Sequence, residues 1–79
     1  MVWFVKLLLE NENILLIAYS YNTDDLDGRI EYNKTKEEFF IKKQSTTADE
    51  YDSKKTIQFL WNLIGTDKLS EEPYRICTG

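Results

Sequence analysis

The stretch DDLDGRIEY, residues 24–32, holds the densest group of side chains that could carry out chemistry. Three aspartates precede Gly28, and Glu31 follows it. Carboxylates at alternate positions before a glycine are typical of an EF-hand calcium loop, in which oxygen ligands occupy positions 1, 3, 5, 7 and 9, glycine position 6 and a bidentate glutamate position 12. The alternative interpretation is a turn between two strands.

The two ends of this segment do not fit a calcium loop. With Gly28 at position 6, position 1 is Thr23 and position 12 is Lys34, so the first carboxylate is absent and a cation replaces the bidentate glutamate. The flanking segments have strand patterns, whereas an EF-hand has a helix on each side. The same residues fit a type I turn with aspartate at its first position and a left-handed glycine in a bulge. The sequence favours the turn, with low-affinity metal or small-ligand binding between Asp24 and Glu31 as the alternative.

Catalytic chemistry has little support in the rest of the chain. There is no histidine and one cysteine, which excludes the usual zinc spacings. No serine, threonine or cysteine lies in a nucleophile motif such as G-x-S-x-G, and no glycine-rich phosphate loop is present. Adjacent acids such as Glu37 and Glu38 point to opposite faces of a strand and cannot converge on one substrate. We expect a protein that is not an enzyme, with no catalytic residues, metal ligands or cofactors.

Four lysines and three aromatic residues lie close together along the chain: Lys34, Lys36, Lys42, Lys43, Tyr32, Phe39 and Phe40. Such a mixture could form a stacking platform for single-stranded nucleic acid. Lysines are equally typical of edge strands, where they oppose aggregation. The chain has 14 acidic and 10 basic residues, and its net charge of −4 disfavours general binding to nucleic acid. We expect no nucleic acid partner, and a single-stranded nucleic-acid binder remains the alternative.

Two apolar runs near the N-terminus do not form a membrane span. Lys6 interrupts the first run and the polar residues 10–13 separate it from the second, so no stretch of about 18 apolar residues exists. The charged region of a signal peptide is also missing. The lone Cys77 cannot form an internal disulfide, which suits a reducing compartment. We expect a small acidic, cytoplasmic protein with no membrane contact.

The apolar patterns predict an antiparallel sheet. Residues 2–9 and 14–21 are rich in β-branched and aromatic side chains, and the four residues between them are of hairpin length. Residues 29–34 alternate in polarity, as a strand with one solvated face does. Residues 37–44 predict a fourth strand, with a short helix as the alternative because their three apolar residues are consecutive.

One amphipathic helix is expected after the sheet, over residues 48–64. Thr47 and Glu50 fit a capping box at its start, and Gly65 suits its C-terminal end. The apolar residues of its buried stripe recur at i, i+3, i+4 and i+7: Ile57, Leu60, Trp61 and Ile64.

Together these elements predict one α+β domain over residues 1–79. It is a small antiparallel β-meander of three to four strands, followed by one amphipathic helix packed on the sheet (β-β-β-β-α), with residues 66–79 as a loosely ordered C-terminal segment. The first two strands are apolar on both faces, and one helix can cover only one face. We therefore expect a non-enzymatic protein-interaction or self-associating module, a homo-oligomer or one that binds a protein partner, with Trp3, Val5 and Leu7 as interaction residues.

Overall fold

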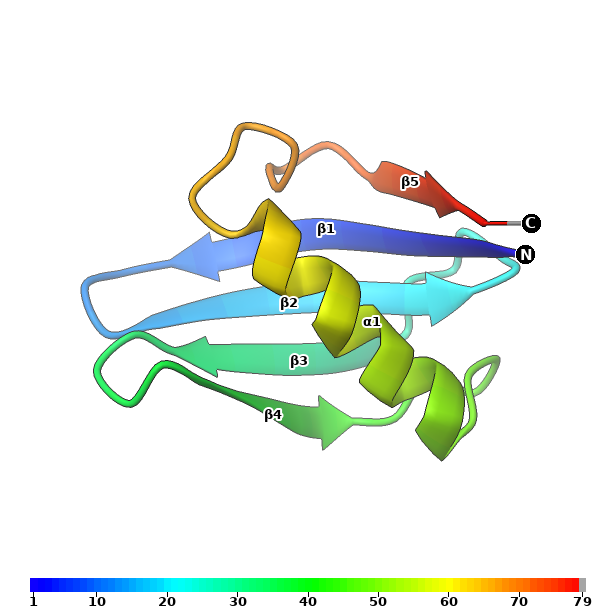
Figure 1. The fold of residues 1–79 in the computed structure, drawn as a ribbon, viewed down its shortest axis with the longest axis horizontal. Coiled ribbons are helices and arrows are strands. Elements are labelled where there is room, and N and C mark those ends of the chain that lie inside the picture. The colour runs from blue at the N-terminus through cyan, green and yellow to red at the C-terminus, as the bar shows by residue number, and fades with distance from the viewer. Residues whose placement is uncertain (79) are drawn as a thin grey trace.

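Residues 1–78, the part of the chain that the computed structural model describes, form five strands and one helix. The elements are β1 (Val2–Glu10), β2 (Ile14–Tyr21), β3 (Gly28–Asn33), β4 (Glu38–Lys43), α1 (Glu50–Leu63) and β5 (Tyr74–Cys77). The strands form one antiparallel sheet in the order β4-β3-β2-β1-β5, and α1 crosses it diagonally (Figure 1). The predicted α+β class and β-β-β-β-α order are confirmed, and β5 adds a fifth strand beside β1.

The first hairpin follows from its turn residue. Asn11 accepts hydrogen bonds through Oδ1 from the backbone N–H groups of Asn13 and Ile14, at 2.8 and 2.9 Å. A short amide side chain commonly replaces a backbone acceptor in this way at turns. The resulting register places Val5 opposite Tyr19, so β1 and β2 are antiparallel neighbours as predicted.

Residues 38–43 form a strand, which decides between the two alternatives left open by their consecutive apolar residues. β4 pairs with β3, with Ile30 opposite Ile41 and Tyr32 opposite Phe39. Phe39 and Ile41 pack against the core. Since side chains alternate along a strand, Phe40 between them points to the other face of the sheet.

The start of α1 differs from the predicted capping box. Asp49 is the N-cap, and its Oδ1 accepts a hydrogen bond from the backbone N–H of Asp52 at 2.8 Å. Thr47 lies upstream of the helix, and its hydroxyl accepts from the backbone N–H of Tyr21 at 3.0 Å. The capping-box prediction is wrong because the end of β2 takes up the threonine hydroxyl, while an aspartate two residues later can serve as the cap.

The end of α1 agrees with the prediction. The helix ends at Leu63, Ile64 is its C-cap, and Gly65 has a positive φ of 78°. Glycine adopts this conformation without the steric cost that a side chain imposes, and it therefore ends many helices.

No helix in the described chain is long and apolar enough to cross a membrane.

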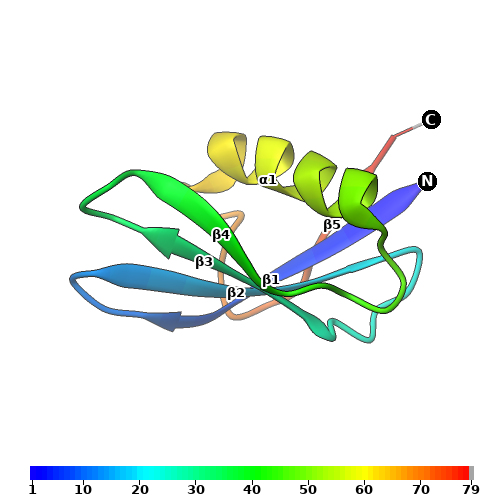
Figure 2. The same ribbon diagram turned by 90° about the horizontal axis from the view of Figure 1, so that it is seen from below.

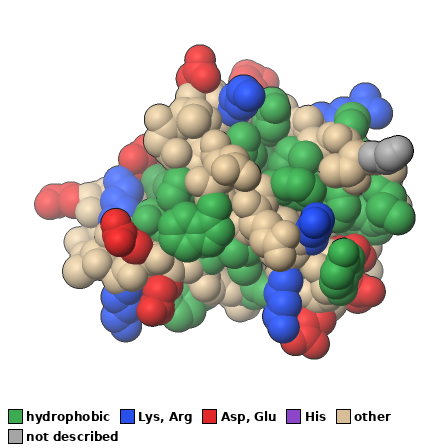
Figure 3. All heavy atoms as spheres, viewed as in Figure 1, with side chains coloured by type: hydrophobic (Ala, Val, Ile, Leu, Met, Phe, Trp, Pro, Cys, Tyr) green, Lys and Arg blue, Asp and Glu red, His purple; other side chains and the backbone are tan. Residues whose placement is uncertain are grey.

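The core lies between α1 and one face of the sheet (Figure 2). Every second residue along the central strands points to this face. The fully buried apolar residues of the three central strands are Val5 in β1, Ile17 and Tyr19 in β2, and Ile30 in β3. Viewed from the α1 side, hydrophobic side chains reach the surface in separate places among acidic and basic ones (Figure 3).

The buried side of α1 agrees with the predicted stripe in part, since Leu60 is buried and Ile57 and Ile64 pack against the core. Its buried residues are Ser53, Thr56, Leu60 and Leu63. Trp61, predicted within the stripe, is 48% exposed at the margin of the helix, where its ring meets those of Tyr32 and Phe39 edge-on, at centroid distances of 5.8 and 4.9 Å. Ser53 and Thr56 can be buried because their hydroxyls are hydrogen-bonded, to the Tyr19 hydroxyl and the Asp52 carbonyl. A search for apolar residues at helical spacing does not detect such buried polar positions.

The C-terminal segment, expected to be loosely ordered, is joined to the sheet after α1. Leu69 is buried in the core. The carbonyl of Ser70 accepts a hydrogen bond from the backbone N–H of Leu7 at 2.7 Å. β5 then pairs with β1, which places Ile76 opposite Trp3.

Candidate functional site

The aspartate-rich loop between β2 and β3 does not gather its carboxylates around a common point. Within residues 1–78 no group of three or more aspartate, glutamate, cysteine or histidine side chains is arranged to hold a metal ion. Asp27 accepts hydrogen bonds from the Ser45 hydroxyl at 2.6 Å, from the Thr46 backbone N–H at 3.2 Å and from the Thr46 hydroxyl. The Ser45 hydroxyl, followed by that of Thr46, lowers the pKa of Asp27 to about 2. Asp27 thus joins two loops of the protein.

Gly28 has a structural role that differs from the predicted one. It is the first residue of β3, opposite Tyr19 of β2, and Gly65 is the one glycine with a positive φ among residues 1–78. A Cβ atom on Gly28 would clash with the ring of Tyr19 at its Cε1 atom. The prediction of a left-handed glycine is therefore wrong: this position needs glycine because an aromatic ring packs directly against its backbone.

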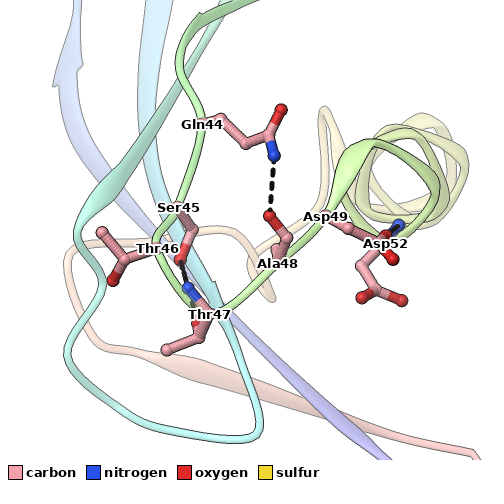
Figure 4. Close-up of a pocket in the computed structure, with 7 residues that line it drawn as sticks. All are labelled: Gln44, Ser45, Thr46, Thr47, Ala48, Asp49 and Asp52. Atoms are coloured by element: carbon pink, nitrogen blue, oxygen red, sulfur yellow. Dashed lines mark hydrogen bonds between the residues drawn. The ribbon is translucent and has the colours of Figure 1, made fainter.

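Polar side chains gather where β4 leads into α1, around a surface depression (Figure 4). The depression is lined by Gln44, Ser45, Thr46, Thr47, Ala48, Asp49 and Asp52. Gln44 donates to the carbonyl of Ala48 at 3.1 Å, and the hydroxyls of Ser45 and Thr47 lie 2.9 Å apart. Partial burial raises the pKa of the Asp52 carboxyl. These groups bind one another and order the connection into α1.

The buried part of this polar region reaches the core through Tyr19. Its hydroxyl lies 2.7 Å from the Ser53 hydroxyl and accepts from the backbone N–H of Ser45 at 3.1 Å. The three groups are buried and mutually satisfied, so they connect β2, α1 and the loop between β4 and α1. Their arrangement stabilises the fold and offers no free group for chemistry.

The second candidate is the face of the sheet opposite α1, which we call the open face (Figure 2). Residues directly opposite each other on paired strands point to the same face. Three rows across the strands form the middle of the open face, with the pair Val2 and Cys77 beyond them on one side and the row Ile14, Asn33 and Glu38 on the other. The cationic row is Lys6, Ala18, Arg29 and Lys43; the apolar row is Leu9, Leu16, Glu31 and Phe40; the third row is Ser20, Phe4 and Arg75.

Apolar surface remains accessible on the open face. Leu9 is 49% exposed and Phe40 38%, and Phe4 and Leu16 are partly exposed. Ala18 is 2% exposed although α1 lies on the opposite side of the sheet. The rows thus form a mixed surface in which a band of cations runs between apolar side chains.

The charges of the open face differ from those of the chain as a whole. Its paired positions hold four basic residues and two acidic residues, Glu31 and Glu38, whereas the chain has 10 basic and 14 acidic residues. The ion pairs found within residues 1–78 are Lys34 with Glu10 and Lys54 with Glu50, so none uses a cation of the open face.

The residues predicted to form an interaction surface lie on the covered face. Trp3 is 3% exposed and Val5 is fully buried, and Leu7 packs against the same core. Trp3 also donates from Nε1 to the carbonyl of Asp52 in α1, at 3.2 Å. The accessible surface of β1 is instead formed by the alternate residues, including Phe4 and Lys6. A lysine within an otherwise apolar strand was the sequence signal for the solvated side.

The structure also divides the predicted lysine and aromatic cluster. Tyr32 and Phe39 lie on the covered face with their ring centroids 4.7 Å apart. Phe40 and Lys43 lie on the open face, with partners that are distant in sequence, such as Leu16 and Lys6. The rows could not be found from the hairpin alone, because four strands contribute to each of the first two.

Comparison of the chain with protein-family models, with curated proteins and with solved structures gives no match. The function therefore has to be inferred from the residues of the site.

Proposed function

We propose that this protein is a non-enzymatic protein-interaction module whose open face receives a protein partner. The observation that carries the proposal is the presence of accessible apolar side chains, among them Leu9 and Phe40, on a sheet face that α1 leaves uncovered. Grouped apolar surface on a small protein is typical of an interaction site. The polar residues around the β4–α1 connection bind one another, which favours the open face over that depression as the site of function.

A selection of random peptides displayed on phage tests this proposal. Peptides enriched on the protein should lose at least tenfold in affinity on Phe40→Asp, because a carboxylate would be buried beneath them. Tyr51→Asp is the matched control, since Tyr51 is 69% exposed on α1, and it should bind the same peptides as the original protein does.

Circular dichroism checks that each variant is folded, and Leu9→Asp offers a second change on the open face. Enriched peptides that bind Phe40→Asp and Leu9→Asp as tightly as the original protein would contradict the proposal.

We also propose a cytoplasmic location. Cys77 is exposed and free, and an exposed thiol persists most readily in a reducing compartment. Fractionation of cells that express the tagged protein tests this location, and recovery from an oxidising compartment would contradict it.

A further inference from the structure

The cationic row has a regular geometry. It takes one residue from each of four neighbouring strands, with Lys6 and Lys43 at its two ends and Arg29 between them. Neighbouring strands lie about 4.8 Å apart, so the row is about 14 Å long between its end Cα atoms. Three carboxylates at alternate positions of an extended chain span about the same 14 Å.

The apolar side chains cannot be covered without also covering the cations. The cationic row lies between the row of Leu16 and Phe40 and the row of Phe4. Burying an ammonium or guanidinium group is strongly unfavourable unless a counter-charge accompanies it. The ion pairs of the described chain leave Lys6, Arg29 and Lys43 without a carboxylate within 4.0 Å. A partner that buries this face must therefore bring its own acidic groups.

From this charge complementarity we infer that the partner is an acidic, amphipathic protein segment, which places carboxylates along the cationic row and apolar side chains on either side of it. The inference rests on the proposed function and names the chemistry of its partner. Arg29 is already oriented toward the β2–β3 loop, since its Nη1 donates to the carbonyls of Leu26 and Gly28, at 2.7 and 2.8 Å. Lys6 and Lys43 are the cations that can adjust to a partner.

Two other occupants fit less well. A second copy that docks its own open face by a two-fold axis would bring two cationic rows together, and like charges in contact oppose association. A nucleic acid strand would be repelled by the net charge of −4. Its bases would also meet mainly aliphatic side chains and Glu31, because Phe4 and Phe40 lie in different rows on opposite sides of the cations.

Binding of defined peptides tests the inference. The probe is a fluorescent peptide with aspartate at every second position and leucine or phenylalanine between, and the reference peptide has asparagine in place of each aspartate. We expect the acidic peptide to bind the full chain at least tenfold more tightly than the reference, and its affinity to fall as salt is raised. Lys6→Glu and Lys43→Glu should each weaken binding about tenfold, whereas Lys68→Glu, the same charge change in the loop after α1, should not.

The possible failures are distinguishable. Equal affinity for the two peptides, or no effect of Lys6→Glu and Lys43→Glu in folded variants, would overturn the acidic partner. If binding of the phage-selected peptides still required Phe40 and Leu9, the open face would remain a protein-binding site, and only the inference of an acidic partner would fail. Oligouridine serves as the nucleic acid probe, and binding that Lys6→Glu and Lys43→Glu abolish would overturn the inference in favour of a nucleic acid partner.

Discussion

At the scale of the single residue, Tyr19 explains more of the fold than any residue of the aspartate-rich stretch. Its hydroxyl joins Ser53 of α1 to the backbone of Ser45, and its ring packs on the backbone of Gly28. Buried polar groups favour one arrangement when all of them are satisfied. The glycine that resembled a calcium-loop position is present because this ring occupies the space of a side chain.

Gly28→Ala should destabilise the protein by about 1–3 kcal/mol, the usual cost of overpacking a core, because the added Cβ meets the ring of Tyr19. Gly65→Ala is the comparison: its φ of 78° disfavours a side chain but nothing lies within 4 Å, so a loss of about 1–2 kcal/mol is expected from backbone strain alone. Urea denaturation measures both. The near-ultraviolet circular dichroism should change for Gly28→Ala only, and an unchanged spectrum and stability would show that the ring does not require glycine there.

The carboxylate of Asp27 should make stability depend on acid pH. Its pKa in the folded protein, about 2, lies below the usual 3.8, so its contribution is fully present above about pH 3.8 and is lost as pH falls through 2. Asp27→Asn should therefore lower the free energy of unfolding at pH 6, and its difference from the original protein should shrink between pH 4 and pH 2. Thr46→Val, which removes one donor to this carboxylate, should also lower the free energy of unfolding at pH 6, but by less than Asp27→Asn. A difference that stays constant over this pH range would refute the role of the ionised carboxylate.

At the scale of the element, the ends of α1 decide where the helix can form. Asp49 satisfies the N–H of Asp52, and Ile64 donates to the carbonyl of Leu60 before Gly65 turns the chain away. Thr47 is held at β2 instead of capping the helix. The position of the N-cap therefore depends on the hydrogen bond that holds the loop before α1 against β2.

Asp49→Ala should reduce stability by about 1 kcal/mol, the usual cost of losing an N-cap side chain. Asp49→Ser retains a cap oxygen and should recover most of that loss. Thermal unfolding followed at 222 nm measures the three proteins under one set of conditions. Equal stability of the alanine and serine variants would mean that the Asp49 side chain does not cap the helix.

Much of the fold could be predicted at this scale, and much of the candidate site could not. β-branched and aromatic runs predicted β1 and β2, and the turn at residues 11–13 is local. The face of the sheet that α1 covers cannot be read from the sequence of β1 alone, because Phe4 and Val5, on opposite faces, are both apolar. For that reason the prediction placed Trp3, Val5 and Leu7 on the interaction surface. The open face also depends on the irregular pairings between Leu7 and Leu9 and between Arg29 and Ile30, which alternation within one strand does not predict.

At the scale of the whole molecule, the basic residues are distributed unevenly over the surface, which the net charge of the chain does not show. An acidic chain places four of its cations on one face of its sheet and its apolar side chains among them. Small domains with two apolar sheet faces often associate with copies of themselves. Here the cationic row opposes contact between two open faces, while it still attracts a partner of opposite charge.

The last prediction concerns this balance in solution. The protein should be a monomer in light scattering at low ionic strength, because like charges of two open faces repel. Replacing Lys6 and Lys43 together by leucine removes that repulsion and enlarges the apolar surface, so the mass should rise with concentration toward a dimer. Replacing Lys54 and Lys68 by leucine changes the composition by the same amount. These two positions lie away from the open face, so that variant should remain a monomer. A dimer of the original protein that strengthens as salt is lowered would contradict the prediction, because its cations would then be paired with the acidic groups of a second copy.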